Sequence, residues 1–367
     1  MKRREFVKGS AALAGASAFL GLRVEQVSAA QLDVPTIDKL TMRVLIDSSH
    51  DQFLRPVKVN GVAHQPPGPG RGNPDFRKVL HNQWGLSLYL QSERGAEQRT
   101  VMLDFGYSPD ALINNIEITR VDPKKVEALI VSHGHYDHFG GLQGFLAKYR
   151  SVLPADIKLY AGGEDNFCHR YAGTQTQLTD MGVLDRRELT THRITTVLCE
   201  TPTIIAGHAF TTGKIERQSI ERVLPNSLVE FAIKDGLGCN AIHYTPAELQ
   251  GKIVPDEHIH EHATCFNLKD RGLVVISSCG HVGIVNSVRQ AQKVSGVEKV
   301  HAVVGGFHLG PAPKDYLDQV TAEMKKLNPD VIIPMHCSGT NFIQAVREQM
   351  PDKLLVSTTG SQFIFGT

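Results

Sequence analysis

The sequence carries almost no excess charge of either sign. Its 39 Lys and Arg residues are balanced by 38 Asp and Glu residues, which leaves a formal net charge of +1. This balance gives the chain no electrostatic attraction for nucleic acids or anionic membranes, so we expect a small-molecule substrate and no nucleic-acid partner. The 41% hydrophobic content is ordinary for a globular protein, and 367 residues suffice to bury a full core. Function must therefore come from local sites.

Cysteines are few and show no framework spacing. The six are dispersed along the chain: Cys168, Cys199, Cys239, Cys265, Cys279 and Cys337. The closely spaced cysteines that staple small secreted domains are absent, so we expect mostly free, buried thiols.

The first thirty residues differ in kind from the rest of the chain. MKRREF is basic, GSAALAGASAFLGL is an apolar run of about fourteen residues, and VSAAQ offers small residues suited to signal-peptidase cleavage. The apolar run falls short of the ~20 residues of a spanning helix, which disfavours the alternative of a membrane anchor. Because Arg3 and Arg4 are adjacent and are followed by Phe6 and Lys8, the segment resembles a twin-arginine signal.

We therefore expect a twin-arginine-type signal peptide over residues 1–30 and one mature domain over residues 31–367. The partner of this signal would be the twin-arginine export machinery, which transports folded proteins. The mature chain would be periplasmic and would make no membrane contact once the signal is removed. Folding before export would also keep the thiols reduced at that stage.

Short runs rich in branched residues and bounded by turn residues predict strands at 41–47, 86–91, 100–106 and 126–132. The Pro/Gly-rich stretch 64–74 predicts an irregular loop, and apolar spacing predicts an amphipathic helix over 139–149. Residues 156–262 show strand candidates at 156–162, 191–198 and 228–234 but no clear boundary.

The C-terminal part alternates more regularly. It predicts a hairpin over 265–278, helices at 284–294 and 313–327, and strands at 299–306 and 330–336. This alternation favours an α/β architecture with helices on both faces of a central sheet layer.

Residues 131–141, VSHGHYDHFGG, hold the densest cluster of candidate metal ligands. In an extended segment His133 and His135 point the same way, so both imidazoles can reach one cation at ~2.0–2.1 Å, and Gly134 removes a side chain between them. Asp137 and His138 follow at the turn into a helix, where they can address a second cation. Two metal ions ~3.5–4 Å apart would hold a hydroxide nucleophile. The alternative, a solvated histidine-rich loop, is disfavoured by the buried-looking strand before it.

Further ligands must come from distant segments. His281 in SSCGHVG and His336 in IIPMHCSG each follow a strand-like run and precede small residues, which predicts imidazoles presented at a sheet edge. A structural histidine is the alternative at both positions. Cys279 is a thiolate ligand or bridge if its side chain points inward, although a buried inert thiol supporting the site is the favoured interpretation. Cys337 should point away from the site on an extended segment.

The sequence does not decide between a role at the site and a structural or surface position for four other residues. His308 in GGFHL lines the pocket as a substrate-binding or proton-transfer residue, or is structural. His208, Lys214 and Arg217 would contact an anionic substrate, although surface placement is favoured for all three.

At these residues the sequence resembles the metallo-β-lactamase superfamily, whose hallmark His-x-His-x-Asp-His is matched by His133, His135, Asp137 and His138. The resemblance extends to LDFG, where it implies that Asp104 supports the metal-binding histidines from behind. It also implies a four-layer αββα sandwich with the metal site at one edge of the two sheets.

The segments GLSLYL, SHGHYDHFGGL, TTGKIER, GLVVISSCGHVGIVN, VVGGFHL and PMHCSG resemble the subgroup related to dihydropterin-ribofuranosyl-aminobenzene-phosphate synthase. The resemblance implies a metal-dependent hydrolase whose activated water attacks an ester, lactone, amide, thioester or phosphoester, with Asp137 orienting the water. Zinc is the default for one or two ions, and Mn or Fe accept the same ligands. The alternatives are a transferase like that synthase, or an exported metal-binding protein without turnover.

The chain departs from the commoner superfamily pattern at one ligand. That pattern has a histidine some twenty residues before the later acidic ligand, in a Gly-His-Thr-Pro segment that this sequence lacks. His258, His260 and His262 lie in about that region, but their alternate spacing in a polar stretch favours a solvated turn. The sequence therefore leaves the first metal's ligand set open.

Overall fold

The computed structural model describes residues 31–67, 75, 77–240 and 253–366, and the chain from Leu32 onward forms one compact unit. The predicted signal peptide lies outside the described residues, as does most of the predicted loop 64–74. No helix within the described part of the chain is long and apolar enough to cross a membrane.

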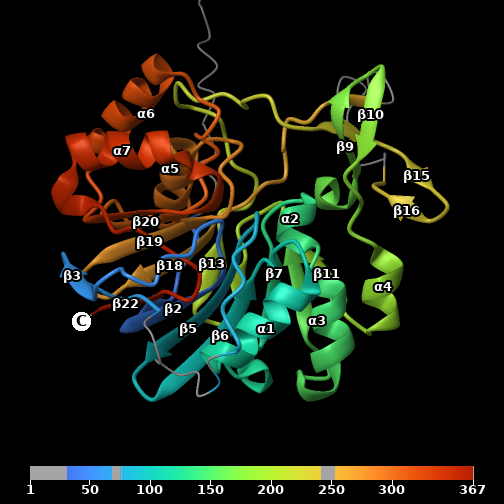
Figure 1. The fold of residues 1–367 in the computed structure, drawn as a ribbon, viewed down its shortest axis with the longest axis horizontal. Coiled ribbons are helices and arrows are strands. Elements are labelled where there is room, and N and C mark those ends of the chain that lie inside the picture. The colour runs from blue at the N-terminus through green and yellow to red at the C-terminus, as the bar shows by residue number, and fades with distance from the viewer. Residues whose placement is uncertain (1–30, 68–74, 76, 241–252, 367) are drawn as a thin grey trace, which may run out of the picture. The chain divides into compact units, whose positions relative to one another are not determined.

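One large sheet is built mainly from the N-terminal half of the chain (Figure 1). In spatial order its nine strands are β11 (Thr195–Leu198), β8 (Lys158–Ala161), β7 (Ala128–Val131), β6 (Glu97–Leu103), β5 (Ser87–Arg94), β2 (Lys39–Ile46), β22 (Gln362–Phe365), β4 (Val62–Gln65) and β3 (Val57–Val59). The strands from β11 to β6 pair in parallel, and the others pair antiparallel.

A second sheet is built mainly from the C-terminal half. Its described path runs β12 (Ile204–Ile205), β13 (Ala209–Thr211), β18 (Thr264–Leu268), β19 (Gly272–Ser277), β20 (Val300–Gly305) and β21 (Val331–Pro334), with β1 (Thr36–Ile37) paired to β18. β18 and β19 form the predicted hairpin, and β19, β20 and β21 are parallel.

Successive side chains of each strand point to opposite faces of its sheet, and this separates the apolar side chains into layers. In β6, Val101 and Leu103 join the core between the two sheets, whereas Met102 faces the helices on the outer side. In β19, Val274 enters the same central core and Val275 packs on the helices of the opposite side. The αββα sandwich is therefore confirmed, with three apolar layers between four layers of backbone.

Helices cover both outer faces. Those on the N-terminal sheet are α1 (Pro109–Thr119), α2 (Tyr136–Phe139), α3 (Leu142–Tyr149) and α4 (Arg186–Thr191), and those on the C-terminal sheet are α5 (Ile284–Ser295), α6 (Lys314–Leu327) and α7 (Gly339–Gln349). Short 3-10 turns are η1 (Pro123–Lys125), η2 (Arg150–Val152), η3 (Glu164–Phe167), η5 (His336–Ser338) and η6 (Pro351–Lys353).

A smaller sheet projects from the sandwich between β8 and β18 in sequence. It consists of β10 (Gln177–Asp180), β9 (His169–Thr174), β14 (Leu228–Glu230) and β17 (Ile253–Pro255), with the hairpin β15 (Ile233–Lys234) and β16 (Leu237–Gly238) beside it. A disulfide joins Cys168 and Cys239 in this region, and the other four cysteines are free and buried. The expectation of free thiols was wrong for this pair, because the topology, not the spacing in the sequence, brings the two residues together.

Two predicted elements are divided in the structure. Within the helix predicted over 139–149, Phe139 is the last residue of α2 and residues 142–149 form α3, with Gly140 and Gly141 between them. Gly141 passes so close to the carbonyl oxygen of Phe105 that a side chain there would collide with it. The strand predicted over 228–234 is split into β14 and β15, and that predicted over 191–198 begins only at Thr195.

The central core predicts a large cost for Leu88→Ala. Leu88 lies in β5, is fully buried and packs in the core between the sheets, so its truncation should lower the free energy of unfolding by about 2–5 kcal/mol. Denaturant unfolding measures this change. Leu178→Ala in β10, where the side chain is 38% exposed, serves as the control. Equal losses in the two variants would contradict this account of the core.

Candidate metal centre

The candidate ligands converge at one edge of the sandwich because they follow the ends of strands that point to that edge. The signature, residues 131–141, begins at the end of β7. Cys279 and His281 follow β19, and His336 follows β21. β18 runs antiparallel to β19, so the segment before β18, which holds His258, reaches the same edge.

Four buried imidazoles form a compact cluster, called here the imidazole set: His133, His135, His258 and His281. Every pair of their ring centroids lies between 3.8 and 5.6 Å apart. Ligand atoms of three of the rings, those of residues 135, 258 and 281, lie within 4.8 Å of one another. The structure therefore brings His258 to the two histidines of the signature, at the position that the sequence left open.

A second group, called here the acidic set, consists of Asp137, His138 and His336. The Nε2 atoms of His138 and His336 are 3.3 Å apart, and Asp137 Oδ2 is 3.2 Å from His336 Nε2 and 3.8 Å from His138 Nε2. Donors bound at about 2.0–2.1 Å around one tetrahedral ion are separated by about 3.3 Å, so this triangle has the size of a metal site. The two sets adjoin, since the rings of His133 and His138 are 4.3 Å apart.

The hydrogen bonding of the ring nitrogens indicates whether the site suits a metal ion. His133 Nε2, His258 Nδ1 and both ring nitrogens of His281 are buried and have no hydrogen-bond partner among the described residues. A buried polar atom without a partner is unfavourable, and neutral imidazole nitrogens are good ligands for zinc, iron and manganese. The donors present thus fit a transition-metal ion, and one or two ions match the two sets.

Electrostatics keep the imidazole set in the form that binds metals. Burial lowers the pKa of each of its four rings well below the ordinary value, and the charge of Arg170 lowers the pKa of His133, His135 and His258 further. Burial raises the pKa of Asp137, but the charge of His138 and the hydrogen bond with His336 outweigh it and hold that pKa far below its usual range. Neutral rings and an ionised carboxylate are the ligating forms of these side chains.

Asp104 orients two of the signature histidines. Its Oδ2 accepts hydrogen bonds from His138 Nδ1 and from Ser132 Oγ, each at 2.7 Å, and its Oδ1 accepts the Ser132 N–H at 2.8 Å. Ser132 Oγ is also 3.0 Å from His133 Nδ1. Both imidazoles are thereby held through Nδ1, which leaves Nε2 facing the site. This is the placement that the resemblance implied for Asp104.

His336 is held in a similar way by the end of β2. Its backbone N–H donates to Asp47 Oδ1 at 2.8 Å, and its Nδ1 lies 3.0 Å from Ser48 Oγ. The ring of Trp84, which is 58% exposed, meets the ring of His336 edge-on at 4.7 Å. Asp47, Ser48 and Trp84 were not predicted from the sequence; the polar Asp-Ser pair directly after a strand was the one available signal.

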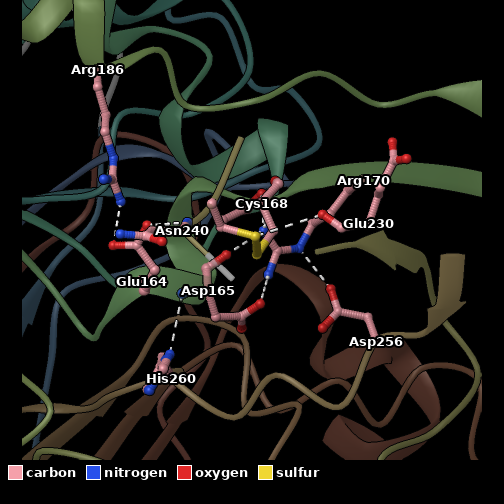
Figure 2. The surroundings of a disulfide bond; sticks show 11 residues. Glu164, Asp165, Cys168, Arg170, Arg186, Glu230, Asn240, Asp256 and His260 are labelled. Carbon is pink, nitrogen blue, oxygen red and sulfur yellow. Dashed lines mark hydrogen bonds and ion pairs between the residues drawn. A yellow bond between two sulfur atoms is a disulfide. The ribbon is translucent and has the colours of Figure 1, made fainter. Parts of the chain in front are cut away.

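Arg170, also missed, links the projecting sheet to the site, and Figure 2 shows it beside Asp165 and Asp256. It is fully buried, and its guanidinium donates to Asp256 Oδ2 at 2.6 Å and to Asp165 Oδ1 at 2.9 Å. The same group donates to the carbonyl oxygen of Gly134 in the signature at 3.2 Å, and Asp256 Oδ1 accepts the N–H of His258 at 2.9 Å. A side chain at Gly134 would collide with Arg170, so this glycine serves the packing of the arginine and not only access to a cation.

The solvated turn expected at 258–262 is wrong, because all three histidines there are buried. His258 Nε2 lies 3.0 Å from Asn226 Oδ1, which leaves Nδ1 for the imidazole set. His260 Nδ1 accepts the N–H of Asp165, and His262 Nε2 donates to the carbonyl oxygen of Val131. The last two therefore stabilise the backbone around the site.

The expectation that Cys337 points away is also wrong. The chain does not stay extended after β21: His336 adopts φ +46° and begins the 3-10 turn η5, which rotates Cys337 inward. Its sulfur lies 3.1 Å from that of Cys279. Cys279 itself lies with His133 and His281 in one group of mutually close donors and with His138 and His336 in another.

The remaining candidates separate into two kinds. His308 is half-buried, its ring centroid is 4.1 Å from that of His281, and both residues line a small cavity that Arg222 also lines. The surface placement favoured for His208 is wrong, since this ring is buried between Ser92 and Glu97. Lys214 and Arg217 are exposed, as expected.

Left-handed backbone conformations gather at the site. Asp104, His258, His308 and His336 all have φ between +46° and +57°, although none is a glycine. Residues with side chains seldom adopt this region unless surrounding contacts enforce it, and such positions cluster at functional sites.

The fold and the two donor sets define a protein of metallo-β-lactamase fold with a candidate transition-metal centre. The sequence model of the Metallo-beta-lactamase superfamily matches residues 87–170, which include the signature. Together with the similarity to individual proteins and structures, this match confirms the resemblance to that superfamily.

Two related proteins and one solved structure show which members of the superfamily this chain is similar to. The 7,8-dihydropterin-6-methyl-4-(beta-D-ribofuranosyl)-aminobenzene-5'-phosphate synthase of Methanocaldococcus jannaschii is 27% identical over 269 residues, or 72% of this chain and 84% of that protein. An uncharacterized protein of the same organism is 27% identical over 266 residues, or 71% of this chain and 86% of that protein. The crystal structure of a metal-dependent hydrolase of the beta-lactamase superfamily superimposes with a TM-score of 0.63 at 19% identity, covering 88% of this chain and 98% of that one. This last likeness shows the fold.

The network around Asp104 predicts that Asp104→Asn weakens metal binding by about 10–100-fold, because one fewer acceptor orients His138 and His133. Asparagine tolerates the left-handed backbone at this position, so the backbone should be retained. Zinc affinity is measured by competition with a chelator. Asp110→Asn, at an exposed position in the first turn of α1, is the control. Unchanged affinity in Asp104→Asn would refute the orienting role.

The two buried ion pairs of Arg170 lead to a prediction about the stability of the protein. Arg170→Met would leave Asp165 and Asp256 buried without their cation, so the free energy of unfolding should fall by about 3–5 kcal/mol. Arg187→Met removes an exposed arginine paired to Asp185, and its effect on the free energy of unfolding should be much smaller. Chemical denaturation measures the free energy of unfolding of both variants. A decrease in Arg170→Met no larger than in the control would show that the arginine does not stabilise the structure around the site.

Proposed function

We propose that this protein is an exported metal-dependent hydrolase that acts on a small molecule through an ester, lactone, amide, thioester or phosphoester bond. One observation supports the proposal most strongly: the imidazole set, which holds buried nitrogens without a hydrogen-bond partner among the described residues, lies beside the acidic set. The metal-dependent hydrolase with the same fold is consistent with this proposal.

Each of the two donor sets would hold one metal ion. His135, His258 and His281 would hold one ion, with His133 beside them, and Asp137, His138 and His336 would hold a second. Metal ions bound at such a site supply a water of lowered pKa and an electrophile for the oxygen under attack. Zinc is the proposed metal, since nitrogen and carboxylate ligands suit it, and iron or manganese would accept the same donors.

Protein groups at the rim would handle the substrate. Asp137 is part of the acidic set and can accept a hydrogen bond that orients the attacking water. His308 is half-buried beside His281, where it can transfer a proton to the leaving group. The exposed ring of Trp84 beside His336 offers an apolar surface for the part of the substrate that does not react.

A transferase like the Methanocaldococcus synthase is the second candidate, favoured by the sequence similarity to that protein. A phosphorylated substrate would need basic groups near the metals. Of the residues that line the cavity beside His281 and His308, Arg222 is the sole lysine or arginine, and Arg217 is engaged by Glu257. Arg222 thus offers one cationic contact for an anionic group of the substrate beside His281 and His308.

Export is proposed from the twin-arginine-type segment at residues 1–30. The disulfide between Cys168 and Cys239 supports it, because disulfides persist in oxidising compartments such as the periplasm. Export in the folded state would let the metal centre be loaded before transport.

The test combines metal content with turnover. Purified mature protein should contain one to two transition-metal ions per chain by elemental analysis, and should hydrolyse at least one substrate in a panel of esters, lactones and phosphoesters reconstituted with Zn, Mn or Fe. Chelation should abolish that turnover. Activity in metal-free protein would refute the proposal, and metal-loaded protein without any turnover would favour a binding protein.

His336→Ala should lower the metal content and reduce turnover at least about 100-fold, because the acidic set loses one of its two imidazoles. His81→Ala, at an exposed position, is the matched control and should leave both quantities unchanged. Full metal content in His336→Ala would remove this residue from the site.

A further inference from the structure

Another cavity lies on the outer face of the N-terminal sheet, away from the metal centre. It has a volume of about 200 Å³ and forms where β2 and β5 meet the C-terminal end of α1. α1 starts shortly after β6, at the edge of the sandwich that holds the metal centre, and its 11 residues at about 1.5 Å each carry the chain about 16 Å from that edge. The cavity shares no lining residue with the two donor sets, so it is a separate site.

The charges that line this cavity are mainly positive. Arg43, Arg120 and Lys125 line it together with a single carboxylate, that of Asp122. Apart from Val121, the other lining residues carry hydroxyl or amide groups. None of the three cationic side chains forms an ion pair with a carboxylate of the described residues. The cavity is thus locally positive in a chain whose charges otherwise balance.

Arg43 is the most buried of these cations. It faces the outer side of β2, because Met42 and Val44 on either side of it point into the central core. Its guanidinium donates to the carbonyl oxygen of Gly360 at 2.8 Å and to the side-chain oxygen of Gln362, which are neutral acceptors that leave other N–H groups unused. Burial lowers the pKa of Arg43 to about 10, since no carboxylate of the described residues compensates its charge.

We propose that this cavity binds the phosphate group of a small phosphorylated polyol. A phosphate monoester carries close to two negative charges at neutral pH, which matches the excess of cationic side chains over the one carboxylate. The planar guanidinium of Arg43 suits two phosphate oxygens, and the exposed Arg120 and Lys125 add positive charge.

The rest of the lining indicates the kind of molecule that carries the phosphate. Hydroxyl and amide side chains, such as those of Thr41 and Gln91, can exchange hydrogen bonds with the hydroxyl groups of a polyol. The cavity is smaller than the roughly 300–1,000 Å³ of sites for drug-sized ligands, so the polyol has few carbon atoms.

Two features oppose an anion in this cavity, and the cationic groups outweigh them. The C-terminal end of α1 carries roughly half a negative charge, and Asp122 carries one more. Asp122 Oδ1 accepts the backbone N–H of Lys124 at 3.0 Å, which holds the carboxylate at the start of η1. Arg120 ends α1 with φ +57°, so this position holds a cation although its backbone conformation favours glycine or asparagine.

Calorimetric titration of the mature protein with glycerol 3-phosphate tests the proposal, with inorganic phosphate and glycerol as comparison ligands at constant ionic strength. Wild type should bind glycerol 3-phosphate, should bind inorganic phosphate more weakly, and should not bind glycerol measurably. Arg43→Met and Lys125→Met should each weaken the binding of glycerol 3-phosphate at least about tenfold, because a contact to the charged phosphate is lost. Asp122→Asn, which can still cap η1, should strengthen it about 2–5-fold.

Lys124→Met is the matched control, because Lys124 is exposed in the same turn as Lys125 and does not line the cavity. Its affinity should stay within about twofold of wild type. Equal losses in Lys124→Met and Lys125→Met would overturn the site, since they would show a general attraction of surface charge. If Arg43→Met does not fold, this pair of exposed lysines decides.

Three other results would contradict the proposal. Absence of binding in wild type would overturn it, and unchanged affinity in Arg43→Met would place the phosphate elsewhere on the protein. Equal affinities for inorganic phosphate and glycerol 3-phosphate would overturn the polyol. All variants should keep the metal content of wild type, because their positions lie outside the two donor sets, so these outcomes leave the hydrolase proposal untouched.

Discussion

The burial of several neutral imidazoles in one place is the constraint on which the rest of the structure depends. A buried ring nitrogen without a partner costs free energy, and His133, His258 and His281 each bring at least one such nitrogen to the same point. Folding positions these rings through local hydrogen bonds, from Ser132 to His133 and from Asn226 to His258. The nitrogens that remain face one another, and a metal ion is the partner that suits them. Metal binding and stability should therefore be coupled in this protein.

Support for the centre comes from the N-terminal sheet and from the smaller projecting sheet. Asp104, after β6, orients the signature, and Asp47, after β2, holds His336. Arg170 connects the projecting sheet to the centre. Its guanidinium donates hydrogen bonds to Gly134 of the signature and to Asp256, which in turn accepts the backbone N–H of His258. The donors are thus tied to three separate parts of the chain, and a change in any of them would move ligands that lie far apart in the sequence.

The signature could be predicted from the sequence, as could Asp104, His281 and His336 from distant segments, whereas the roles of His258, Cys337 and Arg170 could not. The signature was recognisable because its residues are adjacent and their spacing alone sets their direction. The prediction for Cys337 failed because alternation along a strand holds only while the chain is extended, and the 3-10 turn at His336 ends that. His258 was misjudged because a polar stretch that is buried against a metal site has the same composition as a solvated turn. Arg170 gave no signal, since its partners lie 5 and 86 residues away.

The four-layer sandwich was predicted from the resemblance to the superfamily, and the short apolar runs at β6, β7 and β19 predicted those strands themselves. The projecting sheet escaped prediction, as its short strands are closed by pairings between β9, β14 and β17 across long stretches of chain.

The most direct test of the central claim is a crystal of the mature protein grown with zinc and measured at the zinc absorption edge. We expect anomalous-difference density at one or two positions, among His135, His258 and His281 and among Asp137, His138 and His336. Ordered zinc only elsewhere on the molecule, or none, would contradict the claim.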